Sequence, residues 1–195
     1  MENIGGLGMQ IKGTDLQDCY QIIADKFGDE RGYFSPYFIK ENLKSVGVDF
    51  NVVQCNRSMS SKGVVRGLHF QKQPYTQAKI VEVIAGAALD IVLDLRKDSP
   101  SYMELRAFHL TANDNVSIYV PRGFAHGFLA LEDNTVFQYL IDNDYKPEAE
   151  DGVLLDDPDL KIDWSELKKA YNIDEYITSE KDRKYIILKD RTIDF

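Results

Sequence analysis

Short runs of alternating hydrophobic and polar residues fill most of the chain between Cys19 and Ile141. Because the side chains of a β-strand point to opposite faces in turn, such runs predict strands. Turn residues separate the runs at close intervals, which favours a β-sandwich or barrel over alternating strands and helices. We therefore predict a mainly β fold. The candidate strands are CYQIIADKF, NVVQCN, VVRGLHF, AKIVEVI, AALDIVLDL, ELRAFHL, VSIYV, HGFLAL and TVFQYLI.

Helical spacing of apolar residues occurs in only two short segments, residues 38–46 and the segment that follows Ser165. The apolar positions are Ile39, Leu43 and Val46 in the first segment, and Leu167, Ala170 and Tyr171 in the second. Both helices are expected at the periphery. The charge-rich stretch from Asp142 to Asp163 is expected to be a solvated loop.

Length and composition indicate one globular domain over residues 1–195, with 44% hydrophobic residues to build its core. The 32 acidic residues against 23 basic ones give a net charge of −9, opposite to that of a nucleic-acid-binding protein. Cys19 and Cys55 form no CxxC pair and suit a reducing compartment. We find neither an apolar run long enough to cross a membrane nor a signal-type leader, and we expect a cytoplasmic protein that binds no membrane.

The three histidines differ in their sequence surroundings. His69 ends the run VVRGLHF, His126 lies in VPRGFAHGF, and His109 lies in plain strand sequence, where we expect a structural role. The form P-x-G-x-x-H around His126 is one half of the cupin signature. The other half, H-x-H followed by a carboxylate, would supply metal ligands. Because Phe70 and Gln71 follow His69 instead, we expect no metal and no other cofactor.

The remaining polar residues in these runs suit proton transfer. His69 can act as a base near neutral pH, and Lys79 can stabilise a developing oxyanion. Tyr139, in the run TVFQYLI, can give or take a proton. An epimerisation next to a ketone needs a base on one face of the carbon, an electrophile at the carbonyl oxygen and an acid on the other face.

Several longer segments, in the same order, make the chain resemble the dTDP-4-dehydrorhamnose 3,5-epimerases, a metal-free cupin family of nucleotide-sugar enzymes. The resemblance covers about residues 10–183 and implies a cupin-type jelly-roll barrel with short peripheral helices. The matching segments are DERGYF, QCNRSMSSKGVVRGLHFQ, QAKIVEVIAG, LDIVLDLRKDSPSY, VPRGFAHGFLAL, residues 139–150, DDPDLKIDW and SEKD.

The resemblance implies a role for each matching position. His69 is the general base with Asp182 as its partner, Tyr139 is the acid on the opposite face, and Lys79 stabilises the enolate. His126 lies near the enolate oxygen, where it and Asp90 adjust the site. The positions that hold the nucleotide, the diphosphate or the sugar are Arg31, Gln54, Asn56, Arg66, His126, Glu150 and Lys181. Because substrate binding in this family draws on an adjacent subunit, a homodimer is also implied.

One position departs from the family pattern. The family usually reads DERG-x-F-x-E, whereas this chain reads DERGYFSP, so Pro36 replaces a glutamate that contacts the ligand. Proline offers no polar side chain and no N–H group. The alternatives to a double epimerase are a relative that acts on another nucleotide-activated 4-keto sugar, a single-carbon epimerase or ketoisomerase, and a non-catalytic sugar-binding cupin.

Strand geometry sets a condition on two of these residues. Strict alternation would place Arg66 and His69 on opposite faces of one strand, although both are expected in one pocket. Gly67, which lies between them, could resolve the conflict as a bulge or a strand end. We therefore predict an irregular strand at Gly67.

Overall fold

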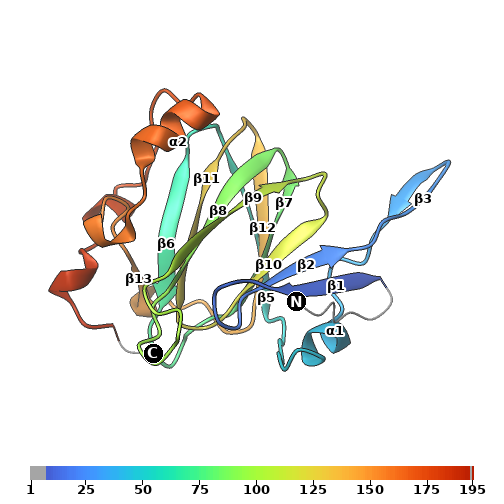
Figure 1. Cartoon of the computed structure of the whole chain (residues 1–195), viewed down its shortest axis with the longest axis horizontal. Coiled ribbons are helices and arrows are strands. Elements are labelled where there is room, and N and C mark those ends of the chain that lie inside the picture. Colours follow the sequence, from blue (N-terminus) through green and yellow to red (C-terminus); the bar gives the residue numbers. More distant parts are fainter. Residues whose placement is uncertain (1–7, 194) are drawn as a thin grey trace.

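Two antiparallel sheets face each other in the computed structural model, which describes residues 8–193 and 195 (Figure 1). In the first sheet the strand order is β1 (Met9–Gly13), β2 (Tyr20–Ala24), β10 (Val116–Val120), β7 (Lys79–Ala85), β12 (Thr135–Ile141) and β5 (Gln54–Ser60). In the second it is β13 (Glu150–Gly152), β6 (Val65–Gln71), β11 (Phe124–Ala130), β8 (Ala87–Asp94) and β9 (Leu105–Thr111). The mainly β fold predicted from the sequence is thus confirmed.

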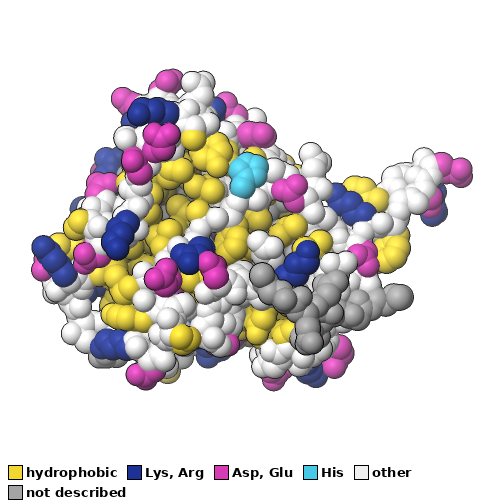
Figure 2. Space-filling view, viewed as in Figure 1, with side chains coloured by type: hydrophobic (Ala, Val, Ile, Leu, Met, Phe, Trp, Pro, Cys, Tyr) yellow, Lys and Arg dark blue, Asp and Glu magenta, His cyan; other side chains and the backbone are white. Residues whose placement is uncertain are grey.

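Apolar side chains form three layers around these sheets. The middle layer lies between the sheets and includes Val81, Val92 and Phe137. The outer face of the first sheet packs against the segment that holds α1 (Lys40–Lys44), while the outer face of the second sheet packs against the C-terminal part of the chain. Figure 2 shows apolar side chains gathered below α2 and bordered by charged ones.

Both predicted helices are present and short. The first is α1, within residues 38–46, and the second is α2 (Trp164–Tyr171). Asp163 caps α2, since its carboxylate accepts a hydrogen bond from the Glu166 amide at 2.9 Å. Trp164 and Leu167 pack against the apolar layer on the outer face of the second sheet, and α2 lies near the upper end of β6 (Figure 1). None of the described helices is long and apolar enough to cross a membrane.

Two segments differ from the sequence-based expectation. Residues 142–163 are not simply a solvated loop, because β13 joins the second sheet and Val153 and Leu160 are buried against it. In addition, β1 precedes the first predicted strand and pairs with β2. The remaining regular turns are short 3₁₀ helices: η1 (Pro147–Ala149), η2 (Pro158–Leu160), η3 (Asp182–Lys184) and η4 (Leu188–Asp190).

A hairpin of β3 (Phe27–Asp29) and β4 (Gly32–Phe34) projects away from both sheets (Figure 1). The rings of Phe27 and Phe34 stack with their centroids 6.4 Å apart, yet the two residues are 50% and 70% exposed. Two strands alone form at best a marginally stable unit. The hairpin is therefore an arm that the rest of the chain does not cover.

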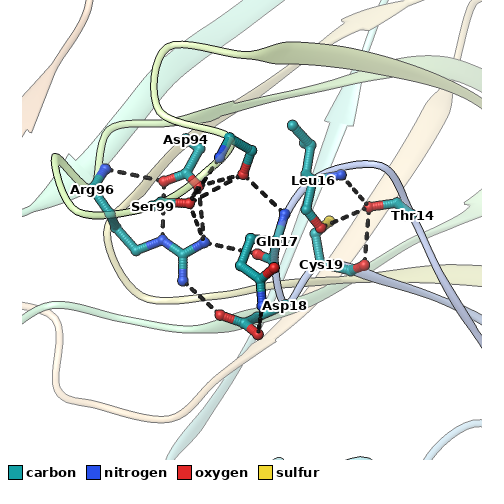
Figure 3. Close-up of polar contacts among 9 residues, drawn as sticks. Thr14, Leu16, Gln17, Asp18, Cys19, Asp94, Arg96 and Ser99 are labelled. Atoms are coloured by element: carbon teal, nitrogen blue, oxygen red, sulfur yellow. Dashed lines mark hydrogen bonds and ion pairs between the residues drawn. The ribbon is translucent and has the colours of Figure 1, made fainter.

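A polar clamp joins the loop after β8 to the turn between β1 and β2 (Figure 3). The Asp94 carboxylate accepts hydrogen bonds from the Arg96 guanidinium at 2.8 and 2.9 Å, and from the hydroxyls of Ser99 and Ser101. Arg96 also donates to the Asp18 carboxylate at 2.9 Å and to the Gln17 carbonyl at 2.7 Å. The clamp thus ties an edge of one sheet to the end of the other.

Candidate active site

A cavity of about 700 Å³ is bordered by residues of both sheets and of the C-terminal segment. Nine of the residues singled out from the sequence line it: Asn56, Arg66, His69, Lys79, His126, Tyr139, Glu150, Lys181 and Asp182. Phe128 and Phe137 also border it, and their stacked rings lie 4.1 Å apart. The site is therefore a polar cavity against an aromatic wall.

An irregularity in β6 places Arg66 and His69 in the same cavity. His69 pairs with His126 and Arg66 pairs with Phe128, so β6 has one residue more than β11 between these pairs. The extra residue is a β-bulge, as predicted at Gly67. Gly67 has φ +110°, and a Cβ atom there would lie 2.7 Å from the Gly127 Cα. Only glycine fits this position without strain.

His69 and Asp182 form a close pair. The His69 Nε2 lies 2.8 Å from the Asp182 Oδ1, and the Gly67 amide donates to Oδ2 at 3.3 Å. Burial acts to raise the pKa of Asp182, but hydrogen bonds from His69, Gly67 and Ser179 outweigh it and lower that pKa. An ionised carboxylate only accepts hydrogen bonds. Nε2 therefore carries the proton, and Nδ1 is left as the basic nitrogen.

Lys79 lies on β7 with its ammonium group inside the cavity wall, where the Nζ donates to the His69 carbonyl oxygen at 3.5 Å. Burial lowers the pKa of Lys79 to about 8, while the charges of Asp90 and Glu150 oppose this shift. Lys79 is consequently charged at neutral pH but weakly solvated. Such a cation stabilises a nearby oxyanion more strongly than an exposed lysine does.

His126 and Asp90 form a second histidine–carboxylate pair deeper in the molecule. The His126 Nε2 lies 2.7 Å from the Asp90 Oδ1, and Asp90 is completely buried. Burial lowers the pKa of His126 in spite of the neighbouring Asp90 charge, so a neutral imidazole faces the cavity. The second oxygen of Asp90, Oδ2, is buried without a hydrogen-bond partner.

Tyr139 lies on β12 and borders the cavity. Burial and the Glu150 charge raise the pKa of Tyr139, so its hydroxyl keeps its proton at neutral pH and can donate it. The cavity therefore brings together an imidazole with a free ring nitrogen at His69, a buried cation at Lys79 and a protonated hydroxyl at Tyr139. These groups suit removal of a proton next to a carbonyl group and its return.

The rim of the cavity carries an ion pair between two predicted binding residues. Lys181 Nζ lies 2.7 Å from the Glu150 Oε1, while the Tyr145 hydroxyl donates to Oε2 at 2.6 Å. Burial alone would raise the pKa of Glu150, but its bonds to Lys181 and Tyr145 lower it. Sequence reasoning did not single out Tyr145, which stands in an irregular segment without strand or helix periodicity.

Two predicted binding residues do not line the cavity. Gln54 lies beside it and donates from Nε2 to the Asn56 Oδ1 at 2.6 Å. Arg31 lies at the tip of the arm, pairs with Asp29 and has a side chain that is 84% exposed. Pro36 stands at the base of the arm. Within the described residues, no three His, Cys, Asp or Glu side chains form a cluster that could hold a metal ion.

Comparison with known proteins shows which family the chain resembles. A family model for dTDP-4-dehydrorhamnose 3,5-epimerase matches residues 13–190. The epimerase of this name from Methanothermobacter thermautotrophicus is 39% identical over 180 residues, covering 92% of this chain and 95% of the relative.

Solved structures extend the likeness to the fold. The dTDP-4-dehydrorhamnose 3,5-epimerase of Elizabethkingia anophelis superimposes with a TM-score of 0.87 at 40% identity, covering 94% of this chain and 98% of that one. A dTDP-6-deoxy-D-glucose-3,5-epimerase of Legionella pneumophila, in complex with dTDP-4-keto-L-rhamnose, gives 0.84 at 34% identity and covers 93% of each chain. The cupin-type jelly-roll fold expected from the sequence is thereby confirmed.

Proposed function

The chain belongs to the dTDP-4-dehydrorhamnose 3,5-epimerase family, and we propose that it inverts carbons 3 and 5 of dTDP-4-keto-6-deoxy-glucose. The product is dTDP-4-keto-L-rhamnose, the sugar nucleotide bound in the Legionella structure. The observation that carries the proposal is the common cavity of His69, Lys79 and Tyr139. These three residues supply the base, the cation and the acid that the reaction needs.

The proposed reaction begins when His69 Nδ1 removes the proton from the carbon next to the carbon 4 ketone. The electrons move to the carbonyl oxygen, where the Lys79 ammonium stabilises the enolate. Tyr139 then delivers a proton to the opposite face of the carbon, which inverts it. Carbons 3 and 5 both neighbour the ketone, so His69 removes the proton from each, after it has passed the first proton to solvent. Tyr139 delivers the new proton at least at carbon 5, and it regains its own proton from solvent.

The imidazolium that forms on His69 is stabilised by the Asp182 carboxylate, 2.8 Å away. This partner also fixes the tautomer in which Nδ1 is free before each proton transfer. His126, kept neutral by burial, gives its one N–H to Asp90 from Nε2, so its Nδ1 is left to accept a hydrogen bond from a hydroxyl of the substrate.

Positive side chains around the cavity suit the diphosphate. Arg66 and Lys181 line it, and a guanidinium group can bind phosphate oxygens in a bidentate way. Asn56 and Glu150 offer hydrogen bonds to the sugar or the nucleoside. Gln54, which bonds to Asn56, supports this wall of the site.

We further propose a homodimer in which the arm of one subunit reaches the cavity of the other. Arg31 lies too far out on the arm to line the cavity of its own chain, and the arm exposes Phe27, Tyr33 and Phe34. A two-stranded arm gains stability only by packing on another surface.

A cytoplasmic location fits the free cysteines Cys19 and Cys55.

The test is incubation with dTDP-4-keto-6-deoxy-glucose in deuterated water, with the proton signals of carbons 3 and 5 followed by NMR. We expect deuterium at both carbons, insensitivity to a chelator and loss of exchange in His69→Ala. His109→Ala is the matched control, because His109 lies on β9 and stacks on Tyr171, away from the cavity. Exchange at one carbon only would indicate a single-carbon epimerase, and exchange that persists in His69→Ala would contradict the assigned base.

A further inference from the structure

The partner of His69 comes from a distant part of the sequence. Asp182 lies 113 residues after His69, in a C-terminal segment that runs beside β6 (Figure 1). Two backbone hydrogen bonds of 2.9 Å attach this segment to the chain at Ile177, one from the Val65 amide and one to the Gly63 carbonyl. Beyond Ile177, the chain must turn back to aim the Asp182 carboxylate at the imidazole.

Side chains hold this turn from two sides. On the outer side, Arg183 donates from Nε to the Thr178 Oγ1 at 2.7 Å and from Nη2 to the Thr178 carbonyl at 3.1 Å. On the inner side, the Asp182 amide donates to the Ser179 Oγ at 3.0 Å. Arg183 is exposed, whereas Asp182 is only 3% exposed. Only the inner hydrogen bond acts directly on the residue that faces His69.

The inner bond fixes the backbone of Asp182 at the first residue of η3. A short side chain has few rotamers, so the position of its backbone decides where its carboxylate lies. That carboxylate must satisfy His69 at 2.8 Å and the Gly67 amide at 3.3 Å together. A hydroxyl at position 179 that accepts the Asp182 amide therefore sets the geometry of both contacts.

We propose that Ser179 is the positioning residue of the His69–Asp182 pair. Its hydroxyl holds the Asp182 amide, so that the carboxylate keeps the proton of His69 on Nε2 and leaves Nδ1 ready to accept a proton. Ser179 does not take part in the proton transfer itself. This inference rests on the proposed function, in which His69 is the base.

Three variants test the proposal in the epimerase assay. Ser179→Ala removes the hydroxyl, and we expect kcat to fall about tenfold, as for one lost hydrogen bond, while KM stays within about twofold. Ser179→Thr keeps a hydroxyl and should return kcat to within about threefold of the wild type. Arg183→Gln breaks only the outer tie of the same turn, and its kcat should equal that of the wild type.

A spectroscopic measurement separates positioning from a general loss of structure. Nitrogen-15 NMR of the His69 ring reports which nitrogen carries the proton. We expect the wild type, Ser179→Thr and Arg183→Gln to show the Nε2–H tautomer, and Ser179→Ala to show both tautomers in exchange. A single Nε2–H tautomer in Ser179→Ala, or a kcat within about twofold of the wild type, would overturn the proposal.

The outcomes also separate this inference from the proposed function. If His69→Ala abolishes exchange but Ser179→Ala does not lower kcat, then His69 is the base and Ser179 is not its positioning residue. Equal losses in Ser179→Ala and Arg183→Gln would mean that only the stability of the turn matters, which would also overturn the proposal. If His69→Ala keeps its activity, the assigned base is wrong and both proposals fail.

Discussion

Two aspartates on one strand, Asp90 and Asp94, show how the same side chain can serve reactivity or stability. Both belong to β8 and both are completely buried. Both oxygens of Asp94 accept hydrogen bonds from Arg96, and Oδ2 also accepts one from the Ser99 hydroxyl (Figure 3). The Ser101 hydroxyl donates to Oδ2 as well. Asp90 instead has one bonded oxygen, held by His126, and one without a partner.

The two carboxylates differ in how much of their negative charge is compensated by hydrogen bonds. A buried charge is stabilised when all its lone pairs are satisfied, and the clamp around Asp94 achieves this. Asp90 keeps part of its charge uncompensated, so that its field acts on Lys79 instead. The clamp is therefore expected to contribute to folding stability, and the Asp90 pair to the chemistry of the cavity.

Asp94→Asn should give the largest effect, on stability alone. The amide cannot accept the full set of hydrogen bonds, and breaking a buried ion pair costs about 3 kcal/mol. For a chain of this length we expect the Tm to fall by roughly 6 to 12 °C. Differential scanning calorimetry measures this change, with the exposed Asp98→Asn on the same loop as control. A loss of kcat without a change in Tm would contradict the comparison.

The same variant has a defined pH dependence. Burial would raise the pKa of Asp94, but bonds from Arg96, Ser99 and Ser101 outweigh it and lower the pKa below its ordinary value of 3.8. The stability that Asp94 contributes is therefore complete above pH 3.8 and is lost as the pH falls through the lower value of the folded state. The difference in Tm between wild type and Asp94→Asn should shrink in this acidic range.

Asp90→Asn should instead change the reaction. Without the Asp90 charge, burial lowers the pKa of Lys79 further below its value of about 8, so less of the ammonium form remains. We expect kcat/KM at pH 8 to fall about tenfold and the basic limb of its pH profile to move to lower pH. The Tm should stay unchanged or rise. An unmoved basic limb would show that Asp90 does not control Lys79.

Much of this architecture could be predicted from the sequence, because alternation reports which face of a strand is buried. The bulge at Gly67 was also predictable, since Arg66 and His69 had to share a pocket. The contacts of Asp182 and Ser179 were not, because they depend on where a loop packs 113 residues away from His69. The local sequence pattern does not show which distant residues a loop will contact. The role of Asp182 in the segment SEKD was therefore predicted only through the resemblance.

The clamp itself was also invisible in the sequence. Asp94, Arg96 and Ser99 form a spacing that is typical of any polar turn. Their contribution to stability comes from burial and from contact with the β1–β2 turn. Neither of these can be predicted from the local sequence. For the arm, the motif DERGYF was recognised in the sequence, but its place in the fold was not. The exposed position of Arg31 depends on how β3 and β4 leave the sheet.

Glu82 on β7 offers a third case and the smallest predicted effect. Its carboxylate accepts a hydrogen bond from the Gln138 amide at 3.0 Å. Burial raises the pKa of Glu82 to about 7, and the bond from Gln138 and the charge of Arg57 only partly oppose it. In how well its carboxylate is compensated, Glu82 is therefore intermediate between the other two residues. Asp94 has a cation against both oxygens, and Asp90 has a neutral imidazole against one.

Glu82→Gln should stabilise the protein by about 1 kcal/mol at pH 8, or roughly 2 to 4 °C in Tm, and not at pH 4.5. The sign follows from the raised pKa, since the wild type loses stability as the pH rises from about 4.5 to about 7 while the glutamine variant does not. Thermal unfolding at both pH values measures this, with the exposed Glu132→Gln as control. A gain in stability that is equal at both pH values would contradict the interpretation, because it would mean that ionisation of Glu82 costs no stability. A neutral partner such as Gln138 would then be enough to satisfy a buried carboxylate. The Arg96 cation in the clamp around Asp94 would be dispensable.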